Sequence, residues 1–140
     1  MAQTAIFGPM LLMMILTLAV WLYMFARRIP FINNSNLTPE QFHPLEFAKL
    51  QPPSVSNPSD NLKNLFELPV LFYGLVVYLH AIQAVDAFYV ALAWGFAGIR
   101  VLHSIVHCTS NHVMTRFGLY ALASVCLWLM LLRAVGSWLF

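Results

Sequence analysis

The stretch Asn64-Leu65-Phe66-Glu67-Leu68-Pro69-Val70-Leu71-Phe72 places one carboxylate inside an otherwise apolar segment. If this segment spans a bilayer, Glu67 lies in hydrocarbon, where an uncompensated charge costs several kcal/mol and requires a partner. Asn64 and Glu67 are three positions apart, so they share one face of a helix. Pro69 has no N–H and crowds the carbonyl four residues earlier, so the sequence predicts a kink beside the carboxylate.

The composition around this stretch is that of a membrane protein. Of 140 residues, 61% are hydrophobic and 9% are charged, whereas charged residues make up about 25% of a soluble domain. The net charge of +2 is too small to indicate nucleic acid as a partner. Cys108 and Cys126 fall in or beside apolar runs, which favours two free thiols over a disulfide. We therefore expect an integral membrane protein in contact with the lipid bilayer.

Four apolar runs are each long enough to cross the roughly 30 Å of hydrocarbon as helices. They predict an all-α, four-transmembrane-helix bundle in a single domain, 1–140, with helices at about 5–26, 62–82, 87–108 and 115–139. The segment 27–61 is rich in proline and is expected to be the one long loop. Within it, Thr38-Pro39-Glu40-Gln41 has an N-cap, a proline at the first helical position and a glutamine at the third, which predicts a short helix.

The basic residues predict the orientation of the helices. Most of them lie in or next to the connections between the first and second and the third and fourth helices, namely Arg27, Arg28, Lys49, Lys63 and Arg116. By the positive-inside rule these connections are cytoplasmic and both termini lie on the non-cytoplasmic side. Arg133, near the end of the fourth run, is expected to extend its side chain outward to the membrane surface.

The polar residues of the predicted helices gather at a common depth. Glu67 and Arg100 lie at similar distances from the cytoplasmic ends of their helices, which predicts an Arg100–Glu67 pair within or between subunits. Spacings of three and four residues place Arg100 with His103 and His107 on one stripe, and Arg116 with Tyr120 on another. Seven such residues fall in the cytoplasmic half of the membrane: Asn64, Glu67, Arg100, His103, His107, Arg116 and Tyr120.

Each of these residues also has a structural interpretation. The Arg100–Glu67 pair can serve only to fix helix register, and His103 and His107 can be packing histidines. Arg116 can be an anchor on the positive side of the membrane. A metal site at these histidines is not expected, because Cys108 points about 100° away from His107 on a helix.

In this arrangement the chain resembles the MAPEG family, the membrane-associated proteins in eicosanoid and glutathione metabolism. The resemblance covers roughly residues 5–139 and rests on four spans and three motifs in order. The motifs are the Asn-x-x-Glu of the second span, followed by Pro69, the Arg-x-x-His of the third and the Arg-x-x-x-Tyr that opens the fourth. Together they are specific, although each alone is weak.

The resemblance implies a homotrimer, resident in a bacterial inner membrane, with glutathione bound between subunits near the cytoplasmic face and a lipophilic electrophile arriving from the bilayer. By that carry-over, Arg116 and Tyr120 are the expected catalytic residues. The expected glutathione-binding residues are Lys63, Asn64, Glu67, Arg100, His103 and His107. Two positions depart from the family pattern: Asp60 stands where the enzymes commonly carry an arginine, and His107 stands where some carry a tyrosine.

Two functions follow from this sequence. The first is a MAPEG-type, glutathione-dependent transferase or peroxidase that acts on lipophilic electrophiles, and the Arg116–Tyr120 motif favours it. The second is a non-catalytic membrane subunit that binds lipid or quinone or docks on a larger membrane complex. Asp60 favours the second function, because its charge has the wrong sign to bind a carboxylate.

Overall fold

The computed structural model describes residues 2–139, and every regular element in that range is helical. The elements are η1 (Gln3–Ile6), α1 (Phe7–Asn34), η2 (Pro39–Phe42), α2 (Pro44–Leu50), α3 (Pro53–Leu65), α4 (Leu68–Ala81), α5 (Ala87–Cys108) and α6 (Val113–Leu139). Four segments are long and apolar enough to cross a membrane, namely Gln3–Asn34, Pro53–Ala81, Ala87–Cys108 and Val113–Leu139. The predicted bundle of four spans is therefore confirmed.

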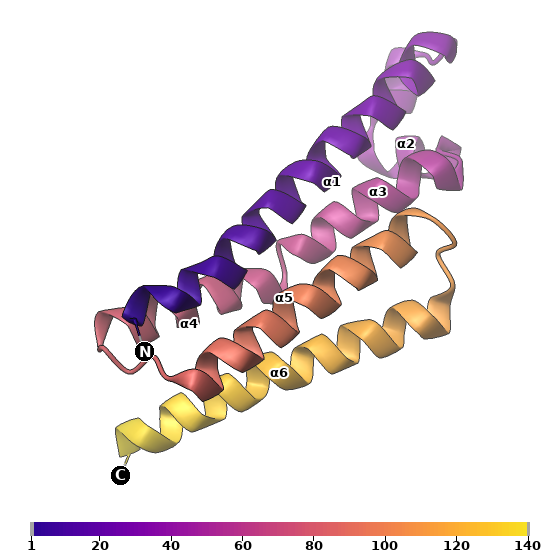
Figure 1. Cartoon of the computed structure of the whole chain (residues 1–140). Helices are drawn as coiled ribbons and strands as arrows, with labels where there is room; N and C mark the ends of the chain where they lie inside the picture. Colours follow the sequence, from indigo (N-terminus) through magenta and orange to yellow (C-terminus); the bar gives the residue numbers. More distant parts are fainter. Residues whose placement is uncertain (1, 140) are drawn as a thin grey trace.

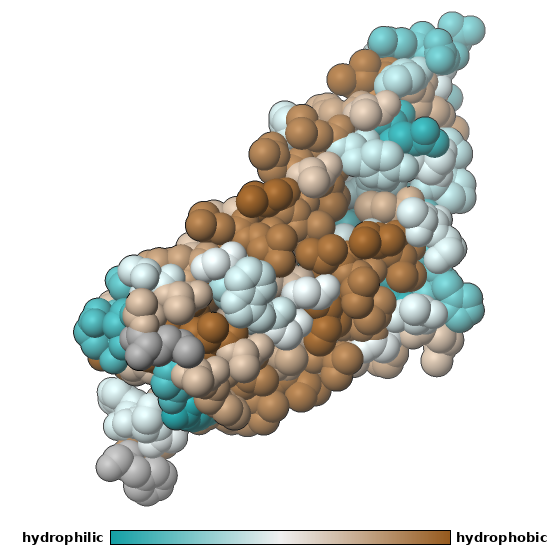
Figure 2. Space-filling model, in the orientation of Figure 1, coloured by the Kyte–Doolittle hydropathy of each residue, from teal (hydrophilic) through white to brown (hydrophobic). Residues whose placement is uncertain are grey.

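The spans lie side by side as an elongated bundle, with both ends of the chain at one end and α2 at the other (Figure 1). Helix α1 packs against α3, α4 and α5, and α5 packs along α6. On the face shown in Figure 2, hydrophobic residues cover the middle of the molecule and hydrophilic residues gather toward its two ends. This surface is that of a multi-pass integral membrane protein in contact with lipid.

The buried core has residues from all four spans, and a pair of stacked rings lies within it. Phe72 of α4 stacks on Phe96 of α5, with 4.6 Å between the ring centroids. Ala93, one turn before Phe96, and Ala97, directly after it, are completely buried. Such small residues let membrane helices approach closely, because packing rather than water exclusion holds them together.

The prediction of one long loop over 27–61 is wrong in its extent. Helix α1 continues through Pro30 to Asn34, and α3 begins at Pro53, so only the short elements η2 and α2 lie between the spans. Pro39 begins η2 as predicted, and Pro44 and Pro53, which indicated a loop, also begin helices. A proline suits the first helical position because a backbone N–H there would have no helical partner, and proline has none. The predicted capping box of Thr38 and Gln41 is confirmed.

The second span is interrupted, where the sequence predicted one kinked helix over 62–82. Helix α3 ends at Leu65 and α4 begins at Leu68. Between them Glu67 has φ −94° and ψ −107°, outside the helical region. Pro69 cannot donate to the carbonyl of Leu65 and its ring crowds that carbonyl. The helix therefore ends and restarts beside the carboxylate, and this break shapes the candidate site.

Candidate functional site

The break between α3 and α4 frees a backbone carbonyl that a buried cation uses. Arg100 of α5 is completely buried, and its Nη2 donates to the carbonyl oxygen of Asn64 at 2.5 Å. Because α3 ends at Leu65, the carbonyls of its last turn have no helical partner. That end of a helix also carries a partial negative charge. Arg100 therefore caps α3, and the end of the helix balances part of its charge.

The predicted Arg100–Glu67 ion pair is wrong within one chain. The ion pairs among residues 2–139 are Lys49–Glu46, Lys63–Asp60 and Arg133–Asp86. The side chain of Glu67 is exposed at the start of α4, where the positive end of the helix dipole favours a carboxylate. The break gives each of the two charges its own helix end. A pair between subunits stays a prediction.

Arg100 keeps unused hydrogen-bond donors. Its Nε and Nη1 are buried and have no hydrogen-bond partner among residues 2–139. Its guanidinium lies 5.5 Å from the ring centroid of Tyr120. Buried polar groups in folded proteins are almost always hydrogen-bonded. Within the described residues, Arg100 therefore lacks hydrogen bonds that a buried guanidinium ordinarily makes.

A cavity of about 290 Å³ opens beside Arg100, between the end of α3, α5 and the start of α6. Its lining residues are Asn64, His103, Val113, Arg116, Phe117 and Tyr120. The structure thus brings together four of the residues expected from the sequence, namely Asn64, His103, Arg116 and Tyr120. Arg100 faces the ring of Tyr120 from α5.

Lys63 and Glu67 do not line this cavity. Both side chains are exposed, and Lys63 Nζ binds Asp60 Oδ1 at 2.9 Å, one turn earlier on α3. Asp60 therefore neutralises the cation that could have replaced the family's arginine.

His107 is buried behind Arg116 and acts as a hydrogen-bond acceptor. Arg116 Nη1 lies 3.1 Å from His107 Nε2 and donates to Asn111 Oδ1 at 2.7 Å. Because arginine only donates, Nε2 of His107 is unprotonated and its ring proton sits on Nδ1. The His107 ring meets that of His103 edge-on, with 5.5 Å between centroids.

Several polar residues that the sequence did not single out support the site. Asn61 of α3 is completely buried, accepts from Ser104 Oγ at 3.3 Å and donates to Cys108 Sγ at 3.4 Å. Asn57 accepts from Asn111 Nδ2 at 3.0 Å. These asparagines were missed because segment 53–61 was interpreted as loop, where such residues are ordinary. A helix signal from Pro53 onward would have placed them on the inner face.

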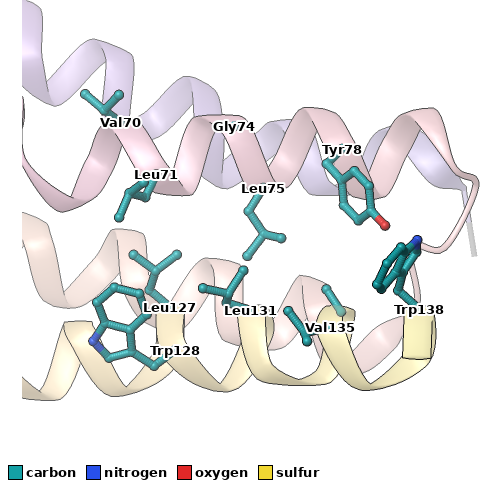
Figure 3. A pocket seen from close by; sticks show the side chains of 11 residues that line it. Val70, Leu71, Gly74, Leu75, Tyr78, Leu127, Trp128, Leu131, Val135 and Trp138 are labelled. Carbon is teal, nitrogen blue, oxygen red and sulfur yellow. The ribbon is translucent and has the colours of Figure 1, made fainter. Parts of the chain in front are cut away.

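An apolar groove of about 580 Å³ runs between α4 and α6 (Figure 3). Leu71 and Leu75 of α4 point toward Leu127 and Leu131 of α6, and Tyr78 and Trp138 face each other at one end (Figure 3). The other lining residues are Val70, Gly74, Trp128, Ala134 and Val135. On α6 the groove lies on the same stripe as Tyr120, because Leu127 and Leu131 follow it by seven and eleven positions. The groove therefore lies on the same side of α6 as the cavity, further along the bundle.

Comparison with known proteins gives one informative result. The chain matches the model of the MAPEG family over residues 6–136, which includes nearly all of the four spans and the whole cavity. No curated protein and no solved structure matches it. The motifs of the resemblance, Asn64 with Glu67, Arg100 with His103 and Arg116 with Tyr120, all lie within the matched range. The chain therefore belongs to the MAPEG family.

Proposed function

We propose that this chain is a MAPEG-type enzyme that binds glutathione and directs its thiol at a lipophilic electrophile, as a transferase or peroxidase. The observation that carries the proposal is Arg100, a completely buried cation with two unpartnered N–H groups beside a polar cavity. Such a group is costly in a membrane unless an anion meets it.

The donor set fits glutathione, a tripeptide with two carboxylates, one ammonium group and one thiol. Arg100 and Arg116 would bind carboxylate and thiolate, and the amide of Asn64 would bind the peptide. Glu67, exposed at the start of α4, would bind the ammonium group, and His103 would complete the wall. His107 would support Arg116 from behind. Lys63 contributes weakly, because Asp60 already pairs with it.

Arg116 supplies the chemistry in this proposal. A guanidinium beside a thiol stabilises the thiolate, which is the nucleophile. The thiol gives its proton to water, and the sulfur forms a bond to the electrophilic carbon. The bond to the leaving group breaks, and that group departs with the electron pair. Tyr120 lines the same cavity, and its hydroxyl would donate a hydrogen bond to the negative charge that develops in the reaction.

The groove between α4 and α6 would hold the apolar part of the electrophile. It is open to the hydrocarbon, almost entirely apolar, and shares the Tyr120 stripe of α6. A substrate dissolved in the membrane could reach the thiolate along it without crossing water.

The proposed assembly is a homotrimer in a bacterial inner membrane, with the cavity near the cytoplasmic face and both termini outside. The exposed carboxylate of Glu67, which lies within a membrane-spanning segment, supports contact with a neighbouring subunit. The basic residues of the two connections support the orientation. The native mass of the detergent-solubilised protein, with its ligand retained, tests the subunit number and the ligand together.

The thiolate is the direct test of the proposed activity. Purified protein mixed with glutathione should show the ultraviolet absorbance of a thiolate, and Arg116→Ala should abolish it. Lys49→Ala is the matched control, because Lys49 is an exposed cation on α2. Absence of both the absorbance and a glutathione-dependent rise in melting temperature would leave the non-catalytic membrane subunit as the function.

A further inference from the structure

The turn between α5 and α6 contains a residue with an unusual backbone. Asn111 has φ +48°, in the left-handed region that glycine adopts freely and asparagine tolerates. Its N–H donates to the carbonyl of Val106 at 2.7 Å and so closes the end of α5. This backbone role requires a residue at position 111 that tolerates the left-handed conformation. It does not by itself require an asparagine side chain.

The side chain of Asn111 makes two further bonds, which join three helices. Its Oδ1 accepts from Arg116 Nη1 of α6 at 2.7 Å, and its Nδ2 donates to Asn57 Oδ1 of α3 at 3.0 Å. Since arginine only donates, the oxygen of Asn111 must face Arg116 and its amide nitrogen must face Asn57. Only one orientation of each amide therefore satisfies the chain of bonds.

These bonds use one nitrogen of Arg116 completely. Nη1 carries two hydrogens, one directed at Asn111 Oδ1 and the other at His107 Nε2. A guanidinium has five N–H hydrogens. The three on Nη2 and Nε have no hydrogen-bond partner among residues 2–139, and the arginine lines the cavity. Asn111 and His107 thus hold the guanidinium from one side and leave its other donors for a ligand.

We propose that Asn111, backed by Asn57, is the positioning residue of Arg116, setting the guanidinium so that its free donors meet a thiolate in the cavity. This inference rests on the proposed function of Arg116. Without the two asparagines, the long arginine side chain could turn toward the headgroup region, as cations near helix ends do.

The competing explanation is that Asn111 serves only to end α5. Asn111→Gly separates the two, because glycine adopts the same φ without strain but removes the amide. Asn57→Ala removes the backing bond and leaves the turn untouched. Ser110→Gly is the matched control, since Ser110 lies in the same turn and its side chain makes no hydrogen bond within residues 2–139.

The experiment measures the pH at which bound glutathione ionises, together with kcat, KM and melting temperature, for the full-length protein and its variants. Asn111→Gly should raise the pH midpoint of thiolate absorbance and lower kcat by about tenfold or more, with a smaller change in KM. Asn57→Ala should also raise the pH midpoint and lower kcat, but by less. Ser110→Gly should change neither the midpoint nor kcat. Asn111→Asp should raise the midpoint most, because its carboxylate neutralises Arg116 from behind.

Each outcome decides the inference. An unchanged midpoint and kcat in Asn111→Gly would overturn it and leave Asn111 as a helix-ending residue. A lower melting temperature in that variant with an unchanged midpoint would do the same. The thiolate absorbance of the unsubstituted protein is measured first. If that protein forms no thiolate, the proposed function fails, and the inference, which rests on it, fails as well.

Discussion

At the scale of single residues, two charges that lie in different membrane-spanning segments are stabilised without forming an ion pair with each other within the chain. Arg100 meets the carbonyl end of α3, and Glu67 stands at the N–H end of α4. A helix end offers unsatisfied backbone groups and about half an elementary charge of dipole. Arg100 therefore has a backbone carbonyl as its partner, and Glu67 lies at the positive end of a helix dipole without a side-chain cap bond.

The two charges should differ in their importance for stability. Arg100→Met removes the donor to the Asn64 carbonyl, and an unsatisfied buried carbonyl costs about 1–3 kcal/mol. Glu67→Gln loses only an interaction with the helix dipole, about 0.3–1 kcal/mol. The melting temperature in detergent should fall more for Arg100→Met, and equal falls would show that the cap is not important.

Asp60 should limit glutathione affinity by neutralising Lys63. Asp60→Asn frees the lysine for a ligand carboxylate, and an exposed pair is worth about 0.2–1 kcal/mol, so affinity should rise by about fivefold at most. Titration calorimetry with glutathione measures the change, and the melting temperature should stay nearly constant. Weaker binding in Asp60→Asn would mean that the carboxylate itself contacts the ligand.

At the scale of elements, prolines decide where backbone groups become available. Pro58 inside α3 cannot donate to the carbonyl of Ser54, and that oxygen instead accepts from Arg27 Nε at 3.3 Å. Pro69 does the equivalent at the start of α4, where the interruption leaves the Asn64 carbonyl to Arg100. In both places a cation from another helix uses the carbonyl that the irregular helix leaves free.

Restoring an N–H at position 69 should partly repair the break. In Pro69→Ala the helix can continue, and the N–H of Leu68 then competes with Arg100 for the Asn64 carbonyl. Amide hydrogen exchange over residues 66–70 should slow, and glutathione should bind more weakly. Pro58→Ala is the control, expected to leave binding unchanged, and unaltered exchange in Pro69→Ala would show that Pro69 does not cause the break.

At the scale of the whole molecule, a polar clamp holds the end of the bundle opposite the cavity. Asp86 accepts from Tyr89 N at 3.0 Å, which caps α5, and binds Arg133 of α6 through both oxygens, at 2.9 and 2.5 Å. The Arg133 guanidinium lies 4.7 Å from the ring centroid of Phe88 and 4.6 Å from that of Tyr89. Arg133 therefore ties α6 to the start of α5.

This clamp should make stability depend on acid pH. The hydrogen bond from Arg133 holds the pKa of Asp86 below its usual value. The folded state thus binds this proton less readily than the unfolded state, whose carboxyl has a pKa of about 3.9. The stabilisation is present above that pH and is lost as the pH falls through the lower folded pKa.

Asp86→Asn tests the clamp, because asparagine still caps α5 but loses the charge. Its melting temperature should be lower than that of the unsubstituted protein at neutral pH, and the difference should disappear in strong acid. Glu46→Gln is the control, because Glu46 pairs only with Lys49 on its own short helix. A constant difference at all pH values would exclude the ion pair as its source.

Much of the architecture was predictable from the sequence for a simple reason. Hydrocarbon cannot hydrogen-bond the backbone, so long apolar runs must become helices that satisfy themselves. The segment around Pro53 was not predictable in this way, because it is polar and its helix is stabilised by contacts with α1 and α5. Helical spacing and depth in the membrane predicted that four residues would lie together, namely Asn64, His103, Arg116 and Tyr120. The roles of Asn57 and Asn111 could not be predicted, because neither belongs to a recognisable motif.

The sequence by itself determined the four membrane spans, the common depth of the polar residues and membership of the MAPEG family. These follow from the length of the apolar runs, the helical spacing of the polar residues and the order of the motifs. Only the tertiary structure decided that Arg100 caps α3 instead of pairing with Glu67, and that Arg116 is held by Asn111 and His107. The physical reason is that a hydrogen bond depends on distances of a few ångströms between groups far apart in the chain. Backbone carbonyls, which every residue carries, become partners only where a helix ends.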